Sequence, residues 1–164
     1  QLGYKPKILT MGRGMLFPSD AEALGDDLAW GITTEVWWTP YHPYKCSYTG
    51  ITPKELCDAY EEENNRQWNA VLGYKHAGIE LVIDVLQRAQ SLDKEKIREA
   101  IIETDLVTIV GPVSYNEENY CETPVVGGQW VKDEDGPWNW KIEIVENTHY
   151  PEIEKTSELL FPIP

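Results

Sequence analysis

The segment "TEVWWTPYHPYKCSYTG" (residues 34–50) gathers two adjacent tryptophans, three tyrosines and two prolines. Its start belongs to the β-branched and aromatic run "GITTEVWW" (31–38), which predicts a strand. The prolines end this strand and make the remainder an irregular connection. Side chains alternate between the two faces of a strand, so Trp37 and Trp38 are expected to point in opposite directions. One ring can then contact a ligand while the other packs in the core; the alternative is that both rings serve core packing.

The helices that follow are predicted from capping signals and hydrophobic periodicity. Thr52 and Glu55 form a capping box, which begins a helix that ends in the acidic run 61–63. A longer helix is predicted at about 68–90, because two stripes of apolar residues repeat there at helical spacing. So wide an apolar face indicates burial between two neighbours. Asp93 is the expected N-cap of a third helix.

The rest of the chain adds short strands and one more helix. Strands are predicted at 6–10, 108–115, 124–131 and 140–146, and a helix from 18–20 to about 29. The strand at 140–146 alternates, with Trp140, Ile142 and Ile144 on one face. The tail 151–164 is bounded by prolines and is expected to lie along the surface. The order of elements predicts a mixed α/β fold with too few strands for a self-contained doubly wound domain.

Composition places the chain among globular proteins and limits its partners. It has 164 residues, of which 41% are hydrophobic and 26% charged. These values allow one ordinary domain with a core. The net charge of −14, without a Lys/Arg cluster, argues against nucleic acid and against an anionic membrane surface as the main partner. The start "QLGYKPK" has no methionine and no signal peptide, which we interpret as a piece of a longer protein.

The three cysteines Cys46, Cys57 and Cys121 do not form a disulfide framework, because their number is odd and small. One bridge with one free thiol and three free thiols both stay open. Their spacings fit no zinc site.

His76 and Glu80 lie four residues apart on a helix, a spacing that can bind a metal. Without a third ligand we expect a hydrogen bond on the helix surface, and neither a metal nor a cofactor.

The loop "TMGRG" (10–14) is the first candidate for ligand binding. Small residues between a strand and a helix can present backbone N–H groups to an anion, and ligands bind at such loops in open α/β sheets. Arg13 can hold a carboxylate through two hydrogen bonds. The alternative is a flexible turn with a solvated arginine.

A catalytic nucleophile is not indicated, since no Ser or Cys stands in a nucleophile-elbow motif. No catalytic residue and no enzyme activity are therefore expected.

Nearly the whole chain resembles the C-terminal part of type I solute-binding proteins, the receptors of ABC importers in the branched-chain amino acid class. The resemblance rests on residues 49–118, which run from "TGITPKELCDAY" to "GPVSYNEE". It also rests on "GYKPKIL" near the start, on "PVVGGQW" and on the tail "PEIEKTSELLFPIP". Its most telling parts are "GYKHA" with Tyr74, "SLDKEKIREAI" and "TIVGPVSYN". The order and spacing of these parts carry the resemblance, since none is a catalytic signature.

The resemblance implies an α/β protein that is a fragment of a two-lobed type I periplasmic-binding-protein fold. In that family the chain crosses between the lobes three times, and the solute is trapped in the cleft between them. By comparison with that fold, residues 1–30 are expected to form the end of the first portion of lobe II, and 31–50 a hinge crossing. Residues 51–107 are expected to form the returning helices of lobe I. Residues 108–116 are expected to form the last crossing, and 117–164 the final strands of lobe II and the tail.

The resemblance also implies a ligand site and partners. The expected ligand-binding residues are Gly12, Arg13 and Met15 of the loop, with Trp37 and Trp38. Amino-acid receptors of this family carry an acid in this loop for the ligand's ammonium group, whereas "MGRGMLF" has Arg13 and no acid. A carboxylate on an apolar or aromatic body, such as an amino acid or an aromatic acid, is the expected solute.

An ABC permease is the expected partner, and the expected location is outside the cytoplasm, in the periplasm or lipid-anchored at the cell surface. The family's N-terminal portion is absent from the sequence, so apolar faces would lack their neighbours and a homo-oligomer is expected. The alternative function is a ligand-sensing extracellular domain of a receptor, and an enzyme is the third.

Overall fold

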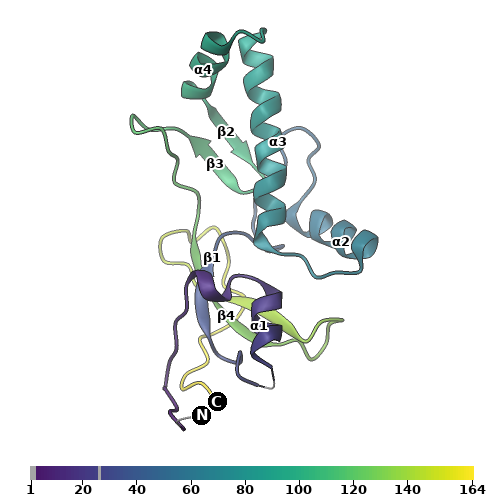
Figure 1. The fold of residues 1–164 in the computed structure, drawn as a ribbon, viewed down its shortest axis with the longest axis vertical. Coiled ribbons are helices and arrows are strands. Elements are labelled where there is room, and N and C mark those ends of the chain that lie inside the picture. Colours follow the sequence, from purple (N-terminus) through teal and green to yellow (C-terminus); the bar gives the residue numbers. More distant parts are fainter. Residues whose placement is uncertain (1–2, 26) are drawn as a thin grey trace. The chain divides into compact units, whose positions relative to one another are not determined.

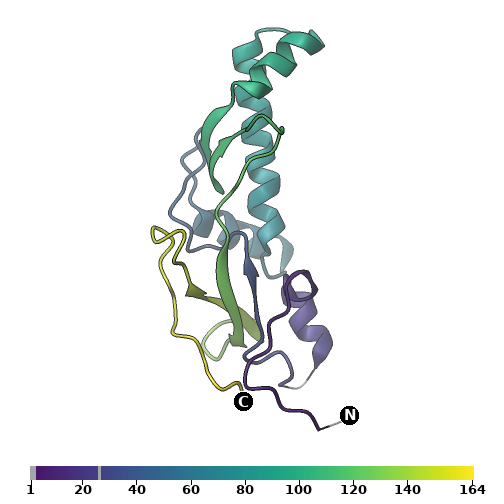
Figure 2. The same cartoon turned by 90° about the vertical axis from the view of Figure 1, so that its left-hand side faces the viewer.

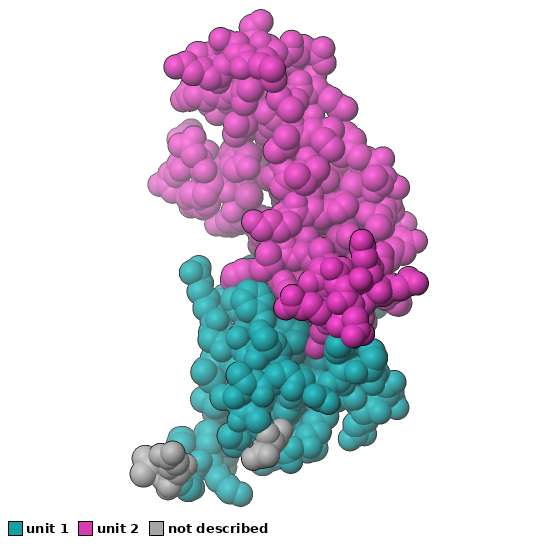
Figure 3. All heavy atoms as spheres, turned by 45° about the vertical axis from the view of Figure 1, so that its right-hand side comes forward, with its two compact units in different colours: residues 1–36, 125–164 teal, residues 37–124 magenta. Residues whose placement is uncertain are grey.

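The computed structural model describes residues 3–25 and 27–164, and it divides into two compact units. Unit 1 comprises residues 1–36 and 125–164, and unit 2 comprises residues 37–124 (Figure 3). No described helix is both long and apolar enough to cross a bilayer. The assignment of sequence ranges to the lobes of a larger fold stays a prediction.

Unit 1 is built on a three-stranded antiparallel sheet in the order β1-β4-β5 (Figure 1). Its elements are the 3-10 helix η1 (Arg13–Met15), α1 (Pro18–Leu24), β1 (Thr33–Val36), β4 (Val126–Lys132) and β5 (Trp140–Glu146). The prediction that Trp140, Ile142 and Ile144 share the inner face of β5 is confirmed, since all three are buried. Trp130 of β4 completes this core at 1% exposure.

Two predictions in the first part of unit 1 are wrong. Residues 6–10 do not form a buried strand: only Thr10 forms a β-bridge, to Thr33, and the Ile8 side chain is 48% exposed. This segment lies at the open edge of the sheet beside β1, where one side of a strand has no partner. The helix expected to reach about residue 29 ends at Leu24, where Gly25 adopts φ = +68°. Position 26 of that expected helix lies outside the described residues.

Unit 2 contains three helices and a two-stranded hairpin. Its elements are α2 (Pro53–Asn64), α3 (Ala70–Ala89), α4 (Lys94–Ile102), β2 (Asp105–Thr108) and β3 (Gly111–Ser114). The capping box is confirmed: Thr52 Oγ1 accepts from the Glu55 N–H at 3.2 Å, and Glu55 Oε2 accepts from the Thr52 N–H at 2.8 Å. Asp93 caps α4 as predicted, by accepting from the N–H groups of Glu95 and Lys96.

The single strand expected at 108–115 is wrong, because the chain reverses there into the hairpin of β2 and β3. Thr108 Oγ1 donates to the Gly111 carbonyl at 3.0 Å and accepts from the Val110 N–H at 3.3 Å, which closes the turn. Gly111 adopts φ = +116°, a conformation that residues with a Cβ rarely reach. Figure 2 shows the hairpin running alongside α3.

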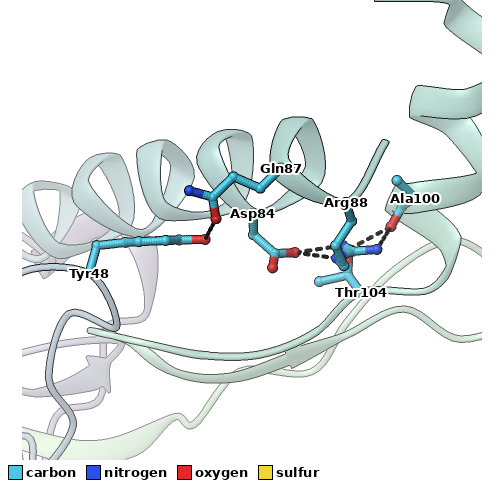
Figure 4. A network of polar contacts seen from close by, with 6 residues as sticks. All are labelled: Tyr48, Asp84, Gln87, Arg88, Ala100 and Thr104. Carbon is cyan, nitrogen blue, oxygen red and sulfur yellow. Dashed lines mark hydrogen bonds and ion pairs between the residues drawn. The ribbon is translucent and has the colours of Figure 1, made fainter. Parts of the chain in front are cut away.

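The long helix α3 is held on one side by α4 and the hairpin. Arg88 of α3 is paired with Asp84 one turn earlier, and it donates to the Ala100 carbonyl of α4 and to Thr104 Oγ1 (Figure 4). The wide apolar face of α3 indicated two neighbours, and in the described chain one side has none: Ile79 is 62% exposed and Val82 is 54% exposed. This agrees with the expectation that apolar faces of this chain lack their neighbours. The elements of unit 2 cover one face of this helix, and an apolar stripe stays open.

Candidate functional site

The loop at residues 11–15 of unit 1 is anchored at both ends by the sheet. The Met11 N–H donates to the Thr33 carbonyl at 2.8 Å, and Thr34 Oγ1 donates to the Gly12 carbonyl at 3.0 Å. At the far end, Trp130 Nε1 donates to the Met15 carbonyl at 2.8 Å. These bonds tie the backbone of the loop to the sheet at both ends. We call this anchored loop the platform; its contact with a ligand stays a prediction.

The exposed part of this platform consists of Gly12, Arg13 and Gly14. The guanidinium of Arg13 is therefore accessible to a solute carboxylate. Met15, in contrast, is only 1% exposed and belongs to the core of unit 1. Within the 3-10 helix η1 the buried residue is Met15.

A carboxylate that the sequence analysis missed lies beside the platform. Glu35 of β1 is half-buried, and a methyl group placed on Gly12 would come within 3.9 Å of Glu35 Oε1. The loop itself carries no acid, as the sequence showed, but the fold supplies one from the neighbouring strand. The signal in the sequence was the single charged residue inside the apolar and β-branched run "GITTEVWW".

The two tryptophans lie in unit 2 and differ in burial. Trp38 is fully buried, its Nε1 donates to the Ile109 carbonyl at 3.0 Å, and its ring meets Trp68 edge-on at 6.2 Å. Trp37 is half-buried and contacts Tyr74 edge-on, with ring centroids 6.2 Å apart. Trp38 is thus a core residue of unit 2, and Trp37 keeps an accessible part. A ligand contact by either ring stays a prediction.

The helical pair His76 and Glu80 is not the surface pair that the sequence predicted. Glu80 is 2% exposed and accepts hydrogen bonds from the Ser47 N–H, the Ser47 hydroxyl and the Ile109 N–H. The chain also brings Cys46 to this pair, so that one ligand atom from each residue lies within 4.8 Å of the others. Spacing along the sequence could not reveal this group, because Cys46 comes from a different segment.

The remaining reactive side chains of unit 2 include three cysteines and His42, and all of these except the half-buried Cys121 are buried. Cys46, Cys57 and Cys121 are all free thiols, which decides between the two states that the sequence left open. Burial raises the pKa of the Cys57 thiol far above its usual range. Burial also lowers the pKa of His42 to about 4, so this imidazole is neutral at physiological pH. These environments disfavour the thiolate at Cys57 and the imidazolium at His42.

No family model matches the chain. Solved structures do match. A leucine-binding protein from Thermotoga maritima is 22% identical and has a TM-score of 0.63, over 85% of this chain and 37% of that one. An ABC-type branched-chain amino acid transporter from Rhodopseudomonas palustris is 17% identical with a TM-score of 0.62, over 94% of this chain and 38% of its own.

A third match is a solute-binding protein of an ABC transporter from Rhodopseudomonas palustris, solved with 3,4-dihydroxybenzoic acid. It is 21% identical with a TM-score of 0.55, over 73% of this chain and 31% of that protein.

The chain has part of a type I periplasmic binding protein fold. The resemblance read from the sequence is confirmed at the level of the α/β fold, and the chain spans between 31% and 38% of the length of these three structures. Two of the proteins it resembles are described as binding leucine or an aromatic acid. At identities this low the likeness establishes the fold, and the solute must be argued from the residues of this chain.

Proposed function

We propose that this chain is part of the substrate-binding component of an ABC importer, acting outside the cytoplasm on a small solute that carries a carboxylate. The fold it shares with solute-binding proteins supports this proposal. The observation that carries it further is the anchored loop with exposed Gly12 and Arg13 next to Glu35. Binding proteins of this kind hold their solute without altering it, so the role proposed is capture and not catalysis.

An amino acid is the solute that this arrangement of charges favours. Arg13 offers a planar, permanently charged donor that matches the two oxygens of a carboxylate. Glu35 offers an acceptor for the ammonium group at the neighbouring position on the same unit. An aromatic acid would use Arg13 alone. The two classes therefore differ in whether they need Glu35.

A ligand panel measured by thermal shift and isothermal titration calorimetry tests this assignment. The panel pairs leucine with 4-methylpentanoate, which lacks the ammonium group, and phenylalanine with 3-phenylpropanoate. Arg13→Gln should weaken every carboxylate about tenfold or more, the value of one charge-assisted hydrogen bond. Glu35→Gln should weaken only the amino acids. Preference of the unmodified protein for neutral or cationic solutes would contradict the proposal.

We propose an ABC permease as the partner that receives the solute. Stimulation of the permease ATPase by the solute-loaded protein in proteoliposomes is the expected result. Solute binding without any effect on transport would favour the alternative role, a ligand-sensing extracellular domain.

We propose that the open apolar stripe of α3 joins two copies of this chain. Ile79, Val82, Ile83 and Leu86 are each at least 36% exposed on this helix. Contiguous exposed apolar side chains on one helix favour association. Sedimentation velocity should show a dimer that Val82→Glu converts to a monomer, while Glu95→Lys on α4 leaves the dimer intact. A monomer at high concentration of the unmodified chain would contradict this proposal.

A further inference from the structure

We propose that Cys46, His76 and Glu80 of unit 2 form a binding site for a divalent transition metal, with zinc as the best-matched ion. One ligand atom from each of the three side chains lies within 4.8 Å of the others. In a tetrahedral zinc site with bonds of about 2.0–2.3 Å, ligand atoms stand about 3.3–3.8 Å apart. The three ligand atoms therefore need to move by about 1 Å, through rotation of their side chains, to reach the separations found around a zinc ion.

The scaffold of the site is fixed independently on each side. His76 and Glu80 stand one turn apart on α3, so they project from the same face of the helix. Cys46 opens a tight turn in which its N–H donates to the Ile51 carbonyl at 3.0 Å and its carbonyl accepts from Gly50 at 2.9 Å. The next residue, Ser47, is bonded to Glu80 itself through both its N–H and its hydroxyl. The thiol is therefore held against the helical pair.

The acceptor positions of Glu80 leave room for a metal bond. An ionised carboxylate offers about four lone-pair positions. Ser47 uses two of them on Oε2, at 2.8 and 3.0 Å, and the Ile109 N–H uses one on Oε1, at 2.9 Å. The hydrogen bonds of the described residues thus leave one position, on Oε1. The carboxylate can bind an ion there while it keeps all three of its protein contacts.

The charges and donor types select the ion. When the metal binds, the Cys46 Sγ–H bond breaks, its proton passes to water, and the sulfur–metal bond forms. Thiolate and carboxylate together carry a charge of −2, which a divalent ion neutralises in a place where Cys46 is 4% exposed and Glu80 is 2% exposed. A soft thiolate with an imidazole favours zinc or cobalt over magnesium or calcium. His76 is half-buried, so it forms the open side through which the ion enters.

Three protein ligands leave a fourth coordination position for water or an exogenous ligand, as in zinc sites that are not purely structural. The site lies wholly within unit 2, and it is separate from the loop of unit 1 that carries Gly12 and Arg13. It neither requires the proposed solute nor predicts one. The proposal therefore stands or falls independently of the solute-binding role.

Titration of the 164-residue chain with Co²⁺ and Zn²⁺ tests this inference. The expected result is one bound metal per chain, with a thiolate-to-cobalt charge-transfer band that Zn²⁺ abolishes. His76→Ala should weaken Zn²⁺ binding at least about tenfold in competition with a chromophoric chelator. Cys46→Ser should remove the charge-transfer band. The matched controls His149→Ala and Cys121→Ser exchange an exposed histidine and a less buried cysteine, and they should change neither result.

A measurement on the unmodified chain keeps the inference testable if a variant misfolds. Zn²⁺ should slow the alkylation of Cys46, mapped by peptide mass spectrometry, and leave the alkylation of Cys121 unchanged. Absence of stoichiometric binding, or loss of the cobalt band in Cys121→Ser instead of Cys46→Ser, would overturn the assignment. Equal Zn²⁺ affinity in His76→Ala and the unmodified chain would overturn it as well.

Discussion

The contact between Gly73 and Trp38 gives the sharpest test of how unit 2 is packed. Gly73 is buried on α3, and a Cβ added to it would lie 2.3, 2.5 and 2.7 Å from three atoms of the Trp38 ring. Contacts between carbon atoms are normally about 3.5–4.0 Å. The ring would therefore have to move by about 1 Å or more, although it is fully buried and its Nε1 is bonded to the Ile109 carbonyl.

The expected cost of Gly73→Ala follows from three contributions. Overpacking in a close-packed core costs about 1–3 kcal/mol, and loss of the Trp38 hydrogen bond costs about 1 kcal/mol more. Replacing glycine by alanine inside a helix returns about 1 kcal/mol. We expect a net destabilisation of about 2 kcal/mol, which would appear in urea unfolding followed by far-UV circular dichroism.

Gly78 provides a matched control on the same helix. It carries the same chemical change, but a Cβ added there meets no heavy atom within 4 Å. Gly78→Ala should therefore stabilise the chain by about 0.5–1 kcal/mol through helix propensity alone. The two variants should differ by about 3 kcal/mol. Equal changes in both variants, or stabilisation by Gly73→Ala, would refute the packing of α3 against Trp38.

Three other predictions concern groups with clear environments. Between pH 6.5 and 4 the free energy of unfolding should fall by up to about 3 kcal/mol, because His42 has its pKa lowered to about 4 and the unfolded chain takes up that proton first. An NMR titration midpoint of His42 near 6.5 would contradict this. Thr52→Ala should cost about 1 kcal/mol in thermal unfolding, since it removes the cap of α2, and Thr52→Asn should keep most of the stability. Alkylation of the native chain should modify Cys121 before Cys57, whose thiol pKa is raised by burial; modification of Cys57 first would show that its site is open.

The helices of unit 2 could be predicted because their signals are local. Thr52 and Asp93 cap backbone N–H groups only two or three residues away, and the apolar repeat of α3 is a property of one segment. The alternation of β5 is equally local. The prediction of these elements therefore needed no knowledge of what they pack against.

The hairpin and the first segment were missed because their structure depends on partners. In "TIVGPVSY" the apolar residues indicate a strand, while the reversal depends on Gly111 and on the side chain of Thr108 closing a turn. Residues 6–10 have the composition of a strand, but their position beside β1 leaves them with a single bridge. Composition predicts the tendency to extend, and the neighbours decide burial and pairing.

Of the two carboxylates of functional interest, Glu35 was missed and Glu80 was expected on the helix surface, for the same reason. Each is a charge inside an apolar run, which marks a position that needs a partner when it is buried. The sequence contains this mark, but it does not identify the partners: Ser47 and Ile109 lie 33 and 29 residues from Glu80. Only the fold brings them together.

The hydrogen bonds that the Glu80 carboxylate accepts also determine whether unit 2 needs a metal in order to fold. Its carboxylate joins α3, the segment at Ser47 and the turn at Ile109 through three hydrogen bonds that need no ion. In small zinc domains the metal supplies the folding free energy, and removing it unfolds the chain. Here the protein contacts already hold the three segments, so the metal binds to a preformed scaffold. The chain with and without Zn²⁺ should therefore give the same far-UV circular dichroism spectrum, while its thermal unfolding rises with Zn²⁺ concentration as expected for binding to the folded state alone.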